Sequence, residues 1–355
     1  MKKISRREFL KASLAGLSLP LGAAALTRMG NGAPLFQGGD GYGGEDPSKN
    51  GGMGNMNDMF GAHGMVSPVG EVDHEANGFN PSDLLTDFDY GTVTEENGRT
   101  VRTYEIYAAN KSIEVMKGIE FPAWTYNGRI PGPTLRATEG DLLRINFFNG
   151  SDHPHTMHFH GIHSHAMDGV PGAGPGLIIP GDAYTYEFEA EPFGLHLYHC
   201  HAFPLARHIA KGLYGAFIVD PKEGRPPVDH EFIMVMAGYD IDFDDENDFY
   251  FVNGIPFHYA MHPIRIGLNE TVRIFLVNTL EYDLINSFHL HANFFNYYPT
   301  GTSLTPIEYT DTIMQTQAQR GIIEFSFKYP GLFMFHAHNT EFAELGWTGN
   351  FLVEE

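Results

Sequence analysis

The feature that most constrains this chain is one sequence pattern that occurs twice. Residues 187–201 align without gaps on residues 324–338, and six of the fifteen aligned positions are identical. Self-similarity at a fixed spacing indicates that one structural unit is repeated along the chain. The sequence therefore predicts two homologous domains in tandem, which we place at residues 86–225 and 226–355.

Both repeats consist of short runs of alternating polar and apolar residues separated by turns. This alternation is typical of half-buried β-strands, and no part of either repeat has a sustained helical period. The chain contains 41 Gly and 22 Pro, a composition that suits turn-rich β proteins. The sequence therefore predicts an all-β fold. The clearest strands are expected at residues 101–108, 142–148, 184–188, 272–277 and 322–327.

Nineteen histidines are present, and eight of them form four His-x-His pairs. The pairs are His158 with His160, His199 with His201, His289 with His291, and His336 with His338. On a β-strand, residues i and i+2 project from the same face, so each pair can direct two imidazoles at one point. A lone histidine is more often structural, but doublets at matching places in two repeats indicate a metal centre. Neutral imidazole suits copper, zinc, iron and nickel.

A second group of possible ligands occurs only in the first repeat. Cys200 is the single cysteine, which excludes an intrachain disulfide, and Ala337 replaces it in the second repeat. His155 precedes the first pair by three residues, and His208 follows Cys200 by eight. One thiolate and two imidazoles in a trigonal array form a blue-copper electron-transfer site. A buried, inert thiol is the alternative, but it does not explain why both neighbours of Cys200 are histidines.

These motifs resemble those of the two-domain multicopper oxidases, small relatives of the laccases. Residues 155–161 match the pattern H-x-x-H-x-H-G, and residues 199–213 match a pattern of His-Cys-His, a further His, and Met or Leu. The similarity extends over residues 86–355. It implies two tandem cupredoxin-like domains, each a Greek-key β-sandwich, with the blue site in the first domain.

The resemblance also implies a ligand set for four coppers per chain. The type 1 copper is expected at His155, Cys200 and His208, with Leu213 at the axial place, where it cannot ligate. The type 2 copper is expected at His158 and His289. The type 3 pair is expected at His160, His199, His201, His291, His336 and His338. Electrons are expected to pass from Cys200 to its neighbouring histidines, where dioxygen is reduced to water.

Reduction of dioxygen consumes protons, so carboxylates are expected near the cluster. Asp168 lies eight residues after His160, a spacing that resembles the second-shell aspartate of the family. Its alternative role is that of a turn residue, because Asp-Gly is a common turn dipeptide. Glu341 and Glu344 follow the last histidine pair, and Glu344 is our candidate for a second proton relay. The sequence does not separate these two glutamates from each other or from solvated loop acids.

The resemblance implies oxidation of phenolic, arylamine or metal-ion donors with dioxygen as the acceptor. It also implies a homotrimer in which neighbouring subunits build the three-copper site. A copper-containing nitrite reductase is one alternative, although its type 2 site needs only three histidines. A non-enzymatic copper-binding protein or electron carrier is another, although it needs only the Cys200 site.

The formal net charge of −22 argues against nucleic acid as a partner, because such a protein must neutralise phosphates with a basic face. Residues 1–26 contain paired arginines, a short apolar run and small residues, the order of a twin-arginine signal peptide. Export to the periplasm or beyond is therefore expected. No stretch is long and apolar enough for a stable membrane span.

Residues 27–85 are rich in Gly, Asn, Asp and Met, and we expect a flexible linker there. Met53, Met56, Met59 and Met65 lie in this segment, and thioethers suit Cu(I). Cu(I) binding by these residues is the alternative to a simple linker.

Overall fold

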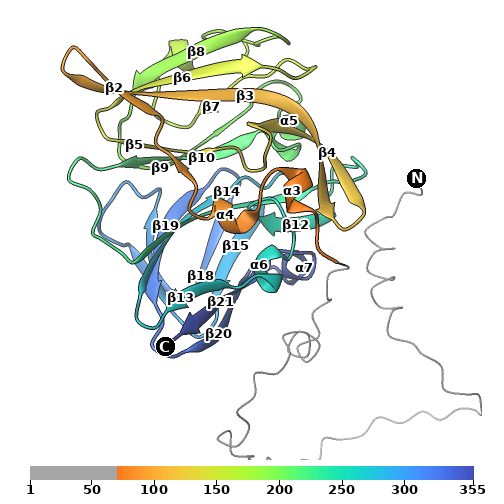
Figure 1. Cartoon of the computed structure of the whole chain (residues 1–355), viewed down its shortest axis with the longest axis vertical. Helices are drawn as coiled ribbons and strands as arrows, with labels where there is room; N and C mark the ends of the chain where they lie inside the picture. The colour runs from red at the N-terminus through yellow and green to blue at the C-terminus, as the bar shows by residue number, and fades with distance from the viewer. Residues whose placement is uncertain (1–69) are drawn as a thin grey trace, which may run out of the picture. The chain divides into compact units, whose positions relative to one another are not determined.

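A computed structural model describes residues 70–355, which belong to one compact unit, Pro68–Glu355. Four sheets make up this unit (Figure 1). Sheet I has the order β2-β3-β6-β8, with β4 paired to β3, and sheet II has the order β1-β5-β10-β9-β7. Sheet III has the order β12-β11-β14-β19-β16-β17, and sheet IV has the order β13-β21-β20-β15-β18.

The strands of sheet I are β2 (Thr92–Glu96), β3 (Arg99–Met116), β4 (Ile119–Tyr126), β6 (Leu142–Asn149) and β8 (Ala183–Glu189). Those of sheet II are β1 (Phe88–Asp89), β5 (Thr134–Thr138), β7 (His158–Phe159), β9 (Gly194–His199) and β10 (Tyr214–Asp220).

Those of sheet III are β11 (His230–Tyr239), β12 (Phe249–Val252), β14 (Thr271–Asn278), β16 (Phe295–Pro299), β17 (Glu308–Thr310) and β19 (Arg320–Ser326). Those of sheet IV are β13 (Ile264–Gly267), β15 (Ile285–Leu290), β18 (Thr312–Thr316), β20 (Gly331–His336) and β21 (Thr348–Glu354). The helices are short: α3 (His74–Asn77), α4 (Pro81–Leu84), the 3-10 helix η2 (His165–Met167), α5 (Leu205–Ala210), α6 (His258–Met261) and α7 (Thr340–Glu344).

The sheets pack in the order I, II, III, IV, and a hydrophobic layer separates each from the next (Figure 1). Ile145 of sheet I and Phe217 of sheet II share the first layer. Leu197 of sheet II and Phe275 of sheet III share the second. Because sheet II is covered on both faces, every residue of β9 is buried. Aromatic rings such as those of β16 and β15 fill the third layer.

The predicted all-β fold is confirmed, and each of the five predicted strands lies on an observed one. They correspond to β3, β6, β8, β14 and β19. Sheets I and II form a sandwich from the first repeat, and sheets III and IV form a sandwich from the second.

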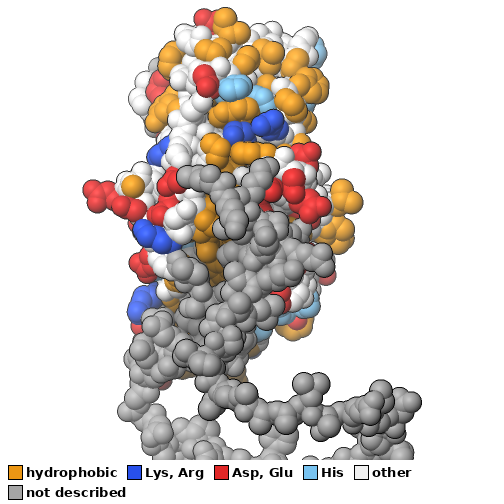
Figure 2. Space-filling view, turned by 90° about the vertical axis from the view of Figure 1, so that its right-hand side faces the viewer, with side chains coloured by type: hydrophobic (Ala, Val, Ile, Leu, Met, Phe, Trp, Pro, Cys, Tyr) orange, Lys and Arg blue, Asp and Glu red, His pale blue; other side chains and the backbone are white. Residues whose placement is uncertain are grey.

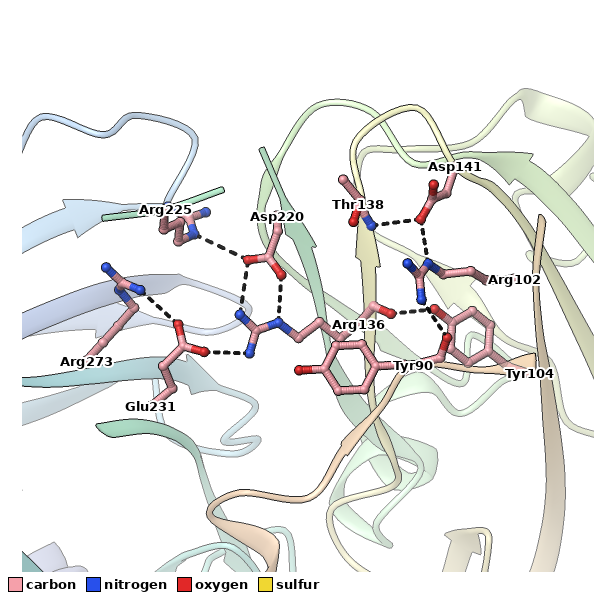
Figure 3. Close-up of polar contacts among 10 residues, drawn as sticks. All are labelled: Tyr90, Arg102, Tyr104, Arg136, Thr138, Asp141, Asp220, Arg225, Glu231 and Arg273. Atoms are coloured by element: carbon pink, nitrogen blue, oxygen red, sulfur yellow. Dashed lines mark hydrogen bonds and ion pairs between the residues drawn. The ribbon is translucent and has the colours of Figure 1, made fainter. Parts of the chain in front are cut away.

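A network of arginines and carboxylates joins sheet II to sheet III (Figure 3). Arg136 of β5 donates to Asp220 of β10 at 2.7 Å and to Glu231 of β11 at 2.7 Å. Arg273 of β14 donates to the other oxygen of Glu231 at 2.8 Å and to Glu324 of β19 at 2.6 Å. Glu231 therefore lies between one arginine from each repeat, which fixes how the two sandwiches meet.

The structure differs from the predicted linker at its C-terminal end. Residues 74–84 form α3 and α4, which begin at the capping residues Asp73 and Asn80. Phe79 and Leu84 are buried in the layer between sheets II and III. The composition of residues 27–85 did not indicate this, because only a few apolar side chains, among them Val72, anchor so short a segment. Residues 27–69 of the predicted linker and the predicted signal peptide lie outside the described residues.

No helix among residues 70–355 is long and apolar enough to cross a membrane.

Candidate metal centres

Three side chains from separate parts of the first repeat meet in a buried triad: His155, Cys200 and His208. Nδ1 of His155 lies 3.2 Å from Nδ1 of His208, and Sγ of Cys200 lies 3.8 Å and 3.3 Å from these two atoms. Bonds of about 2.0–2.3 Å to a central ion imply edges of about 3.5–4 Å in a trigonal array. The triad therefore matches the donor set and the approximate size of a type 1 copper site.

Local backbone contacts hold the triad in place. His155 exchanges two backbone hydrogen bonds with Ile178, and the amide of Cys200 donates to the carbonyl of Leu213. His208 lies on α5, the helix that follows the Cys200 loop. The side chain of Leu213 is fully buried and has no atom that can ligate a metal.

Burial sets the protonation of the triad in the absence of metal. It lowers the pKa of His155 to about 3 and that of His208 to about 4, so both rings are neutral at pH 7. It raises the pKa of the Cys200 thiol to about 11. The imidazoles can therefore accept a metal directly, whereas metal binding must displace the thiol proton.

A single tryptophan packs against the triad. The ring of Trp124 lies 5.2 Å from that of His155 and 4.6 Å from that of His208. The ammonium of Lys211 lies 5.0 Å from the Trp124 ring. Phe203, between the cysteine and His208, is 74% exposed, so the loop over the triad offers an apolar surface to solvent. Figure 2 shows histidine and hydrophobic side chains together on the upper part of the face that it displays.

The first two His-x-His pairs converge into one group, called here the first quartet: His158, His160, His199 and His201. His158 of β7 is the direct partner of His199 of β9 in the strand register. Nε2 of His160 lies 2.9 Å from Nε2 of His199, and neighbouring rings are 5.1–5.8 Å apart. Cys200 lies between two members of this quartet in the sequence, so the triad and the quartet share one stretch of backbone.

The second pair of doublets builds the same arrangement in the other sandwich, called here the second quartet: His289, His291, His336 and His338. His289 of β15 is the register partner of His336 of β20. Nε2 of His291 lies 3.0 Å from Nε2 of His336. The two repeats of the sequence therefore place their histidines in the same geometry.

Backbone carbonyls fix the ring orientation of two histidines in each quartet. The Nδ1 contacts are His158 to Asp168 O at 2.9 Å, His199 to Cys200 O at 2.8 Å, His289 to Asp311 O at 3.0 Å and His336 to Ala337 O at 2.7 Å. A carbonyl can only accept, so Nδ1 carries the proton in each case and Nε2 keeps its lone pair. Metal-ligating histidines are held in this way. The quartets thus present nitrogen donors that suit type 2 and type 3 copper.

A hydroxyl supports each quartet at the same place, and we did not predict either residue. Thr156 Oγ1 accepts from the amide of His201 at 2.9 Å, and Ser287 Oγ accepts from the amide of His338 at 2.8 Å. Thr156 and Ser287 each lie two residues before the first histidine of their quartet. Their shared position before a His-x-His pair is the sequence signal that could have identified both residues.

Asp168, the first predicted relay acid, lies against the first quartet. Its Oδ1 is 3.0 Å from Nδ1 of His158 and 3.6 Å from Nε2 of His163. His163 was not assigned a role from the sequence. The carbonyl of Asp311 accepts from His289 beside the second quartet, as that of Asp168 does from His158. Asp311 was not predicted, because its spacing from the histidine pair differs from that of Asp168.

Glu344, the second predicted relay acid, is exposed at the end of α7. Among residues 70–355, no hydrogen bond or ion pair connects Glu344 to a quartet histidine. Glu341 lies on the same helix. The relay role of either glutamate therefore stays a prediction.

The two quartets do not meet within the described chain. Ring contacts join histidines inside each quartet, and in residues 70–355 none joins one quartet to the other. His291 and His338 of the second quartet are exposed. The second quartet is therefore open to solvent, and the two quartets are separate in the described part of the chain.

Comparison with known proteins gives the same family for both repeats. Multicopper oxidase family profiles match residues 108–224 and 233–355. A solved multicopper oxidase is 61% identical, with a TM-score of 0.79, and the match covers 80% of this chain and 100% of that one. A blue copper oxidase from Nitrosomonas europaea is 26% identical, with a TM-score of 0.63, over 72% of this chain and 86% of that one.

A copper-containing nitrite reductase from Neisseria meningitidis is 30% identical over 249 residues, which are 64% of this chain and 63% of the relative. The chain thus spans less than two thirds of the length of the curated nitrite reductases it matches. The profile matches, the 61% identity to a solved oxidase and the paired histidine quartets lead to one conclusion: the chain is a two-domain member of the multicopper oxidase family with cupredoxin-like domains.

Proposed function

We propose that this protein is a laccase-like oxidase that couples one-electron oxidation of phenolic, arylamine or metal-ion donors to the four-electron reduction of dioxygen to water. The observation that carries the proposal is the pair of matching quartets, one beside a Cys-His-His triad. Four coppers per chain, one at the triad and three shared by the quartets, would supply the redox chemistry when bound.

Different residues would serve electron transfer, donor binding and proton transfer in such a reaction. Cys200 links the triad covalently to His199 and His201, which gives electrons a short path between the two centres. The apolar loop that carries Phe203 offers a surface where a donor can approach the triad. Asp168 holds a carboxylate against His158, where it can receive and deliver protons.

We also propose that the active form is a homotrimer in which the first quartet of one subunit faces the second quartet of its neighbour. The separation of the two quartets supports this arrangement, because each quartet leaves histidines partly exposed in the single chain. A full trimer would then hold twelve coppers. We further propose export by the twin-arginine route, which rests on the sequence of residues 1–26 alone.

Nitrite reduction is the second candidate, because the curated nitrite reductases match both repeats. That reaction needs only three histidines at its catalytic copper, and His201, His291 and His336 would then be superfluous. The presence of both complete quartets favours oxygen reduction.

Copper analysis with a visible spectrum and two turnover assays tests the proposal. We expect four coppers per chain, an intense blue absorption and oxygen uptake with a phenolic donor. One copper per chain would contradict it in favour of an electron carrier. Nitrite consumption without oxygen uptake would contradict it in favour of a nitrite reductase.

A further inference from the structure

Three histidines form a cluster that belongs to neither quartet nor to the triad. His74 begins α3, His258 begins α6, and His262 directly follows α6. One ring nitrogen from each lies within 4.8 Å of the others. The His258 ring lies 5.1 Å from that of His74 and 4.7 Å from that of His262. None of these residues was assigned a role from the sequence, because no spacing pattern links position 74 to position 258.

Two ring nitrogens of this cluster are buried without any hydrogen-bond partner. Nε2 of His258 is 2.7 Å from Oγ of Ser82, but its Nδ1 is buried and unpaired. Nδ1 of His74 is also buried and unpaired. Buried polar atoms are rarely left without a hydrogen-bond partner, and a bound ion is one of the few ordinary explanations. Both unpaired atoms are imidazole nitrogens, which are common metal ligands.

Protonation and charge around the cluster favour a cation. Burial lowers the pKa of His258 to about 3, and burial together with the neighbouring His262 lowers the pKa of His74. Both rings are therefore neutral at pH 7 and can donate lone pairs. Three carboxylates surround them: Glu71, Asp73 and Asp83 act electrostatically on His74. Oε1 of Glu71 lies 3.5 Å from Nε2 of His262 and is close enough to become a fourth ligand.

We propose that His74, His258 and His262 bind one divalent transition-metal ion, Cu²⁺ or Zn²⁺, with Glu71 or water completing the coordination. Nitrogens around a tetrahedral ion lie about 3.3 Å apart for bonds of about 2.0–2.1 Å, so modest ring rotations close the site. Three imidazoles and an oxygen suit either ion.

The bound ion would fasten the N-terminal segment to the second sandwich. α3 supplies one ligand, whereas α6, which packs on β21, supplies the others. A hydrogen bond of 2.7 Å from the Tyr259 hydroxyl to the carbonyl of Pro81 already joins α6 to α4. The contact of His258 with Ser82 is another such connection, and the ion would add one from α3 near the point where the described chain begins.

The test uses the full chain with its copper, and compares wild type with His74→Gln/His262→Gln. The matched control is His230→Gln, which removes the histidine of another His-Glu pair. His230 lies on β11, and its Nε2 is 2.6 Å from Oε2 of Glu270. Each protein is equilibrated with Cu²⁺ in one arm and Zn²⁺ in another, freed of excess ion, and analysed for metal per chain. We expect wild type and control to hold one equivalent more than the double variant in at least one arm.

Thermal unfolding gives a second readout. Addition of the retained ion should raise the unfolding temperature of wild type and control, and should leave that of the double variant unchanged, because only binding to the native state stabilises it. If the double variant does not fold, His262→Gln alone, at a half-exposed side chain, should show the same loss.

Equal metal content in wild type and the folded variants, in both arms, would overturn the proposal. The difference in metal per chain between wild type and the double variant is the same whether the other centres contain four coppers or fewer. Failure of the oxidase proposal would change the total count and not this difference.

Discussion

At the scale of single residues, the site depends on which ring nitrogen each histidine presents. The doublets in the sequence reveal how many imidazoles converge, but not which nitrogen faces the centre. Carbonyls of residues such as Asp168 and Asp311 decide this by accepting from Nδ1. Asp168 and Asp311 lie at different spacings from their histidines, so only the folded chain identifies these two carbonyls.

Asp168→Asn tests the role of the carboxylate separately from that of the carbonyl. The variant keeps the backbone acceptor for His158 but removes the negative charge 3.0 Å from Nδ1. We expect copper content to be retained and oxygen uptake to fall about 10–100-fold, the usual effect of losing a group that supports a ligand. Steady-state rates as a function of pH, with copper analysis, measure this. The control is Glu270→Gln, which removes the carboxylate 2.6 Å from Nε2 of His230, away from the triad and both quartets, and should leave the rate unchanged.

Cys200→Ser tests the triad. Oxygen replaces the soft sulfur with little change of shape, so the fold should persist while the blue absorption disappears. We expect about one copper per chain to be lost from the count, because thiolate is the strongest of the three donors. Visible spectroscopy and copper analysis give the result. A variant that keeps its blue absorption would refute the assignment of Cys200 as the ligand.

At the scale of elements, the strand pairs turn two separate sequence motifs into one site. The register of β7 with β9 places His158 opposite His199, and that of β15 with β20 places His289 opposite His336. The sequence predicted the strands from their alternation, but a register depends on loops and packing that alternation does not describe. The contacts between sheets II and III, including the Glu231 network, likewise could not be predicted from the alternation of residues along the strands.

Glu231→Gln tests this network. The substitution removes the charge that Arg136 and Arg273 share, while each arginine keeps a second carboxylate. We expect the free energy of unfolding to fall by about 1–3 kcal/mol. Denaturant unfolding measures this value. Glu187→Gln is the control, because its pair with Arg144 is largely exposed and should contribute at most about 1 kcal/mol. Equal losses in the two variants would contradict the expectation.

The same network predicts a pH dependence of stability. Burial alone would raise the pKa of Glu231, but its hydrogen bonds and ion pairs with Arg136 and Arg273 outweigh burial and lower that pKa below its ordinary 4.5. A lowered native pKa means that the stabilisation is complete above pH 4.5 and is lost as the pH falls through the native value. Unfolding free energies from pH 6 to pH 3 should therefore decrease less steeply in Glu231→Gln than in wild type. Parallel curves would argue against this contribution.

At the scale of the whole molecule, the two open quartets predict that subunits complement one another. A chain with His158→Gln/His160→Gln lacks the first quartet, and a chain with His289→Gln/His291→Gln lacks the second. Each should be inactive alone. Co-expressed, they should recover oxygen uptake to about one quarter of the wild-type level, because random trimers place intact quartets together at one interface in most assemblies. A site built within one chain would show no recovery.

The sequence by itself determined the fold class, the repeat and the identity of the candidate donors, because alternation, self-similarity and residue chemistry are local properties of the chain. Only the tertiary structure decided that His155, Cys200 and His208 lie within 3.8 Å of one another, that α3 and α4 are docked against the core, and that His74 meets His258. These are long-range contacts. They depend on how the sheets pack and on the paths of the loops that connect them. Hydrophobic burial over the whole unit determines the packing and the loop paths together.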